Sequence, residues 1–162
     1  MDAIYWHLVL NHIPILGTFF GGLVVSAGLL VKSEITQRVG MGIFILTGLS
    51  SVVTYFTGTQ AEDAVKELLG ISENLIEVHQ ELASVAMWLM GVMTLASFVS
   101  FIPFRNPLSW NRFSLLVALY SLLVLVVMAR VAFTGGEIRH SEIRSNASEM
   151  QENIPTTEPS DD

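Results

Sequence analysis

The chain has 162 residues, of which 51% are hydrophobic, and a formal net charge of -7. This length fits one domain, and the apolar content is typical of an integral membrane protein rather than a soluble one. The chain has no cysteine, which excludes disulfide bonds, thiolate metal sites, covalent haem attachment through Cys-X-X-Cys-His and a cysteine nucleophile.

Four stretches are apolar over the roughly 20 residues that a helix needs to cross a membrane. They cover residues 13–31, 39–57, 80–102 and 113–133. Short connections make neighbouring helices antiparallel, so the predicted fold class is all-α, an integral membrane four-helix up-down bundle. The membrane domain takes residues 1–140.

The first span opens with the sequence Asn11-His12-Ile13-Pro14. Proline has no N–H and disfavours helical geometry in the residue before it, so we expect the span to start at Pro14 with Asn11 or His12 as its cap. This would hold the His12 imidazole at a fixed position. Capping without any further role is the alternative.

The longest connection, residues 58–79, has a helical pattern of its own. Apolar residues recur at helical spacing from Ala61 to Leu69, and Gly70 can end this short helix. We therefore expect a short outer helix between spans two and three, and a third long helix that begins near Glu73.

The third helix carries His79 about two turns from its start. Small and polarizable residues follow on the same face, at helical spacing: Ala83, Ala86, Met90 and Met93. Such a stripe can line a flat cofactor, or it can simply be core.

The fourth span contains one full charge, Arg130, near its outer end. A charge in a membrane span usually has a partner, and the candidates are Glu62, Glu137 or a haem propionate. Snorkelling toward the surface is the alternative. The double glycine after this span predicts a turn that folds His140 back over the mouth of the bundle.

The last segment, residues 141–162, holds six acidic residues against one arginine. It has too few apolar residues to offset the entropy of ordering, so we expect a disordered acidic tail. No nucleic-acid partner is indicated.

The charges of the connections predict the orientation of the bundle. The links after the first and third spans are basic and contain Lys32, Arg38, Arg105 and Arg112 against one acid, Glu34. Short basic loops stay in the cytoplasm. Both termini are therefore expected on the periplasmic side of a bacterial inner membrane.

All four histidines then lie at outer helix ends: His7, His12, His79 and His140. An imidazole is also stable at a membrane boundary without binding any ligand, because the ring is amphipathic. As ligands, two imidazoles from facing helices suit a bis-histidine haem b. Three imidazoles with Glu62 suit zinc, copper or non-haem iron.

Several short motifs resemble an uncharacterised bacterial family of predicted membrane proteins with an HFPI-like start to the first span. They are HIPI at the first span, TGTQAEDAV after the second, VHQELA at the third and TGGEIRH after the fourth. This chain has Ile13 where many relatives have phenylalanine. The resemblance implies that His12, His79 and His140 act together and that the protein is cytochrome-like.

The first functional hypothesis is a redox module with one haem b near the outer surface, between the quinone pool and a periplasmic electron carrier. His79 with His12 or His140 would be the axial ligands, and Arg130 would bind a propionate. The second is a non-haem metal site of His12, Glu62, His79 and His140. The third is a structural subunit of a membrane complex.

Overall fold

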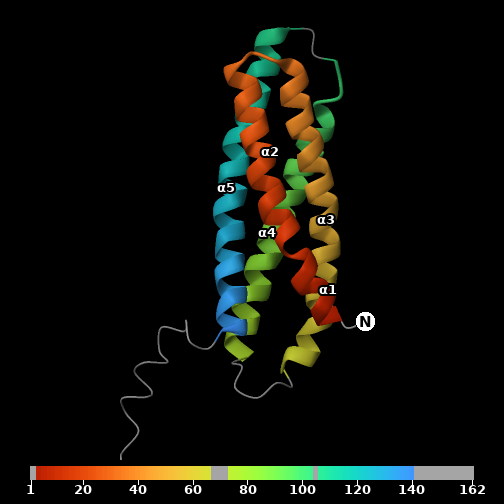
Figure 1. Ribbon diagram of the computed structural model, residues 1–162, viewed down its shortest axis with the longest axis vertical. Helices are drawn as coiled ribbons and strands as arrows, with labels where there is room; N and C mark the ends of the chain where they lie inside the picture. The colour runs from red at the N-terminus through yellow and green to blue at the C-terminus, as the bar shows by residue number, and fades with distance from the viewer. Residues whose placement is uncertain (1–2, 67–72, 104–105, 141–162) are drawn as a thin grey trace, which may run out of the picture.

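The computed structural model describes residues 3–66, 73–103 and 106–140. Within them the chain is entirely helical apart from short connections (Figure 1). The helices are α1 (Ala3–Leu10), α2 (His12–Leu30), α3 (Glu34–Lys66), α4 (Glu73–Val99) and α5 (Pro107–Arg139). Four helical segments of this described part are long and apolar enough to cross a membrane, with α1 and α2 counted as one. The predicted all-α, four-span membrane protein is confirmed.

The four long helices pack side by side as an up-down bundle (Figure 1). α2 contacts α3 and α5, and α4 contacts the same two helices, so α2 lies diagonally across from α4, and α3 from α5. The first and last described residues lie at one end of the bundle. We call this end, which contains all four histidines, the histidine end, and the opposite end, which contains Gln37, the glutamine end.

The spacing of small and apolar residues explains why these helices pack this closely. The buried residues of α2 are Pro14, Thr18, Gly21, Val25 and Gly28. They alternate at intervals of four and three, which is the heptad spacing of helices packed nearly antiparallel in a bundle.

The centre of the bundle is built largely from methionine and phenylalanine. Met41, Phe44, Met90 and Met93 are fully buried. The stripe that follows His79 in the sequence thus points into the core, where Ala86 also packs.

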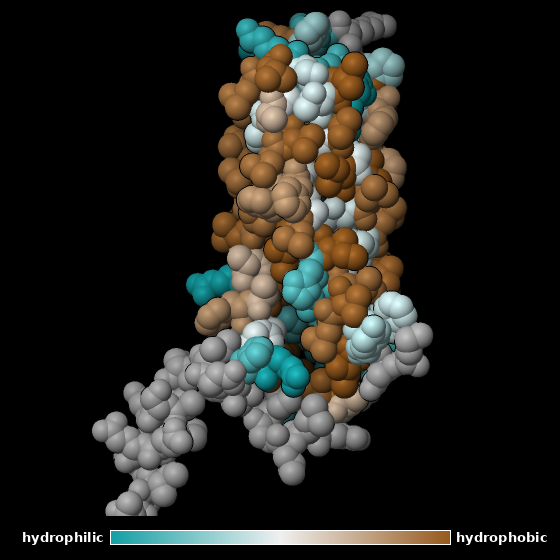
Figure 2. Space-filling model, in the orientation of Figure 1, coloured by the Kyte–Doolittle hydropathy of each residue, from teal (hydrophilic) through white to brown (hydrophobic). Residues whose placement is uncertain are grey.

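The outside of the bundle is apolar over its middle and polar at its ends (Figure 2). Arg112 and Arg130 bracket the apolar stretch of α5, and His12 and Lys32 bracket that of α2. At 1.5 Å per residue each stretch is about 27–30 Å long, close to the roughly 30 Å of bilayer hydrocarbon. These residues therefore mark the expected edges of the membrane.

A kink separates α1 from α2. α2 begins at His12, not at the predicted Pro14, with Asn11 at the predicted N-cap position. Asn11 has helical backbone angles and makes no side-chain cap bond, so the predicted capping by its side chain is wrong. The helix bends instead, because Pro14 has no N–H for the Leu10 carbonyl. The hydroxyl of Thr54, on α3, lies 3.4 Å from that carbonyl and 3.0 Å from the Ser50 carbonyl of its own helix, so the two carbonyls share its one hydrogen. As a result α1 packs mainly on α3 and diverges from α5 (Figure 1).

Two further predictions about helix ends differ from the structure. α3 continues without a break to Lys66, so residues 61–66 extend the second span and do not begin a separate helix; Gly70 lies outside the described residues. α5 runs through Gly135 and Gly136 to Arg139, so the predicted glycine turn is wrong. α4 is helical from Glu73, the first residue described after 67–72, and the acidic tail 141–162 lies outside the described residues.

Candidate imidazole site

Two histidines meet across a diagonal of the bundle at the histidine end. The ring centres of His7, on α1, and His79, on α4, are 6.4 Å apart, and the ring planes are nearly perpendicular, at 88°. Both residues are half-buried. The kink before Pro14 makes this contact possible, because it sets the direction of α1 independently of the rest of the first span.

The neighbour of His7 determines which ring nitrogen carries the proton. Nδ1 of His7 lies 3.0 Å from the backbone carbonyl of Thr54. A carbonyl oxygen only accepts hydrogen bonds, so Nδ1 must be the donor. In the neutral ring the second nitrogen, Nε2, is then an unprotonated base.

His79 is held in the same way by a different group. Its Nδ1 lies 2.9 Å from the hydroxyl oxygen of Thr134, and that hydroxyl donates its own hydrogen to the Val131 carbonyl at 3.0 Å. The Thr134 oxygen is therefore an acceptor for Nδ1–H of His79. Both rings leave Nε2 as the nitrogen with a lone pair.

Each ring lies against a glycine. A Cβ atom on Gly58 would come within 2.9 Å of His7 Cε1, and one on Gly135 within 3.1 Å of His79 Cε1. Real Cβ contacts are rarely this short, so a side chain at either position would push the ring. The glycine of each Thr-Gly pair, Thr57-Gly58 and Thr134-Gly135, thus provides room for an imidazole.

A further polar atom near the pair lacks a partner. Asn11 follows His7 by one helical turn, and its Oδ1 is buried with no hydrogen bond to any described residue. A buried acceptor without a donor is costly. The inner side of α1 therefore has hydrogen-bonding capacity beyond the two histidines.

The pair lies at the level of the expected membrane edge. His79 precedes the exposed Glu81 by two residues, and Thr134 follows the exposed Arg130 by one turn. Figure 2 shows hydrophilic surface at this level, between α5 and the diverging α1. The imidazoles are thus near the lipid headgroups and not at mid-membrane.

The other residues expected in the site are placed as follows. His12 is exposed; it follows His7 by five residues, which turns it about 140° around the helix axis. His140 is exposed and caps α5, with its backbone N–H on the Gly136 carbonyl at 2.8 Å. Arg130 is exposed, and Glu62 pairs with Lys66 at 2.5 Å.

Of the expected ligands, the structure brings His79 together with a histidine that the sequence did not single out. The described residues contain no group of three or more His, Asp or Glu side chains that could hold a metal ion. A signal for His7 was present in the sequence: extended toward the N-terminus, the heptad stripe of α2 runs through Asn11 to His7 and misses His12.

The donor set fits a group that needs two imidazole ligands. Metal-bound histidines characteristically donate their other N–H to a carbonyl or similar acceptor, as His7 and His79 do here. Nε2 of His7 and Nε2 of His79, on rings whose centres are 6.4 Å apart, would hold such a group.

The chain was compared with models of protein families, with curated proteins and with solved structures, and it matches none of them.

Proposed function

We propose that the protein is a membrane redox module that binds one haem b between His7 and His79. The observation that carries this proposal is the meeting of two imidazoles, each with Nδ1–H bound to an acceptor and Nε2 available. Haem needs only two protein ligands because its porphyrin supplies the other four. Haem iron would supply reversible one-electron chemistry.

Residues around the two histidines would determine how tightly the haem is bound. The Thr54 carbonyl and the Thr134 hydroxyl fix the orientation of the two rings, and such outer-shell hydrogen bonds strengthen ligand basicity. Asn11 Oδ1 offers an acceptor on the same helix face as His7. Arg130, exposed at the membrane edge, suits a carboxylate at the headgroup level, including a propionate.

The position of the site suggests the partners. A centre near the membrane edge can exchange electrons with a lipid-dissolved quinone and with a carrier in the adjacent aqueous phase. We assign this edge to the periplasmic side of a bacterial inner membrane because the basic residues Lys32, Arg38 and Arg112 lie near the α2–α3 connection and the start of α5, at the glutamine end. Basic loops stay cytoplasmic.

An absorption spectrum of the protein purified in detergent, reduced minus oxidised, tests the proposal. The expected result is a Soret band and a change on reduction, both lost in His7→Ala and in His79→Ala. His12→Ala is the matched control, because it removes an imidazole from the same end without touching the pair, and it should keep the spectrum.

Metal analysis of the same samples separates the alternatives. A Soret band that survives in both His7→Ala and His79→Ala overturns the assignment of the ligands. Stoichiometric zinc, copper or iron without a Soret band overturns haem in favour of a non-haem metal site. Absence of both haem and metal leaves the chain as a structural subunit of a membrane complex.

A further inference from the structure

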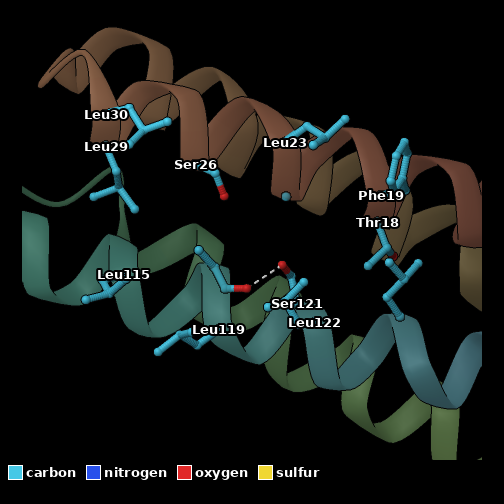
Figure 3. Close-up of a pocket in the computed structure, with 13 residues that line it drawn as sticks. Thr18, Phe19, Leu23, Ser26, Leu29, Leu30, Leu115, Leu119, Ser121 and Leu122 are labelled. Atoms are coloured by element: carbon cyan, nitrogen blue, oxygen red, sulfur yellow. Dashed lines mark hydrogen bonds between the residues drawn. The ribbon is translucent and has the colours of Figure 1, made fainter.

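A groove runs between α2 and α5 on the surface that faces lipid. Its volume is about 430 Å³. Large side chains form the two walls (Figure 3): Phe19, Leu23 and Leu30 from α2, and Leu115, Leu119 and Leu122 from α5.

Small residues form the floor of the groove. Gly22, Ala118 and Ser121 lie between the two walls, and a Cβ atom on Gly22 would come within 3.0 Å of Ser121 Oγ. The helices thus approach closely at the floor, while the leucines on either side stand away from it. The Ser26 side chain points into the groove from α2 (Figure 3).

The length of the groove matches one leaflet of a bilayer. It extends along α2 from Thr18 to Leu30, which is about 18 Å at 1.5 Å per residue. One leaflet contributes about half of the roughly 30 Å of hydrocarbon. An extended acyl chain that lies parallel to the helices would therefore fill the groove.

Two cationic residues, Lys32 and Arg112, lie close in the sequence to the part of the groove nearest the glutamine end. Lys32 follows Leu30 by two residues, and Arg112 precedes Leu115 by three, on the same face of α5 as Leu119. Both cations are exposed, and neither forms an ion pair within the described residues. The groove thus has apolar walls, and its lining ends within two or three residues of a cation on each helix.

We propose that this groove binds an anionic phospholipid, with the phosphate at Lys32 and Arg112 and one acyl chain between the leucine walls. Basic pockets between transmembrane helices recognise anionic headgroups in this way. The charge argues against a zwitterionic lipid as the preferred occupant, and the apolar walls argue against a soluble anion.

Native mass spectrometry tests the proposal. The full chain is reconstituted with an equimolar mixture of phosphatidylglycerol and phosphatidylcholine and then released from detergent in the spectrometer. We expect the wild type to retain phosphatidylglycerol preferentially. The variant Lys32→Gln/Arg112→Gln should lose retention roughly fivefold for each cation removed. Added inorganic phosphate should not compete.

Two variants separate the proposal from a general effect of charge or of folding. Lys66→Gln/Arg139→Gln removes two cations from the histidine end and should retain the lipid as the wild type does. Ser26→Leu fills the groove and should reduce retention while the melting temperature stays unchanged.

Three results would overturn the proposal. They are equal retention of the two lipids by the wild type, equal losses in the two double variants, and a dimer that Ser26→Leu dissociates. The last result would show that a second copy of the chain covers the groove.

Discussion

The two ends of the bundle are each crossed by a polar contact, but on different diagonals and with different chemistry. At the histidine end, His7 of α1 meets His79 of α4. At the glutamine end, the fully buried Gln37 of α3 donates to Asn111 Oδ1 of α5 and to the Gly28 carbonyl, both at 3.2 Å. Each contact links helices that are not neighbours around the bundle.

The two ends differ in which side-chain atoms can still bind a ligand after these hydrogen bonds form. Gln37 uses both of its N–H groups on acceptors within the protein. Its oxygen is buried with no hydrogen bond to any described residue, as that of Asn11 is, but an amide oxygen is a weak base. Each histidine uses its N–H on an acceptor and retains a basic nitrogen. The glutamine contact therefore serves the fold, whereas the histidine contact can also bind a ligand.

Among the variants that distinguish the two ends, Gly58→Ala is expected to have the largest effect, a loss of bound haem. The new Cβ would press on His7 Cε1 and turn the ring away from His79. Disturbing the orientation of a metal ligand typically weakens binding by about 10- to 100-fold, so haem content should fall by about this factor in the purified protein. Gly91→Ala is the matched control, since nothing lies within 4 Å of a Cβ there. Equal haem content in the two variants would show that the ring needs no such space.

An intermediate effect is expected at the glutamine end. Gln37→Leu leaves Asn111 Oδ1 without its donor and takes one of two donors from the Gly28 carbonyl, which keeps the Ser33 N–H at 2.9 Å. The free energy of unfolding should fall by about 1–3 kcal/mol. The double variant Gln37→Leu/Asn111→Leu removes both side-chain partners and should recover part of this loss. Thermal unfolding in detergent measures both, and the haem spectrum should not change. A spectral change in either variant would mean that the two ends are coupled.

The smallest effect is expected from Thr54→Val. The variant keeps the backbone carbonyl that orients His7. It removes the hydroxyl whose hydrogen is shared between the Ser50 carbonyl, at 3.0 Å, and the Leu10 carbonyl at the kink, at 3.4 Å. Side-chain hydrogen bonds in membrane proteins contribute about 0.6 kcal/mol on average, so stability should fall by this amount while the spectrum keeps its position. A loss of haem as large as that in His7→Ala would instead make the hydroxyl part of the site.

The sequence predicts the bundle well because membrane insertion imposes strong requirements. A span must be long, apolar and helical, so the four spans follow directly. Helix ends are less constrained. Gly58, Gly135 and Gly136 lie inside helices, where the local pattern indicated a break. Two of them, Gly58 and Gly135, lie against the histidine rings, a contact with another helix that the local pattern does not contain.

The sequence predicted one of the two histidines of the candidate site and missed the other, and the reason is geometric. His79 was identified, but its partner depends on which face of the first helix points inward. His7 and His12 point in directions about 140° apart, and a start at Pro14 would have favoured His12. The helix continues through the kink, where the Thr54 hydroxyl lies 3.4 Å from the Leu10 carbonyl, a contact with a residue distant in the sequence that no local pattern reveals.

Cysteine cross-linking tests most directly whether α1 and α4 bring their imidazole positions together. The chain has no cysteine of its own, so the variants His7→Cys/His79→Cys and His12→Cys/His79→Cys each present a single pair to a short bismaleimide. The structure predicts an intramolecular cross-link in high yield for the first pair and little for the second, as read by mass spectrometry of the digested protein. Equal yields, or a higher yield for the second pair, would contradict the convergence of His7 and His79 on which the proposed site depends.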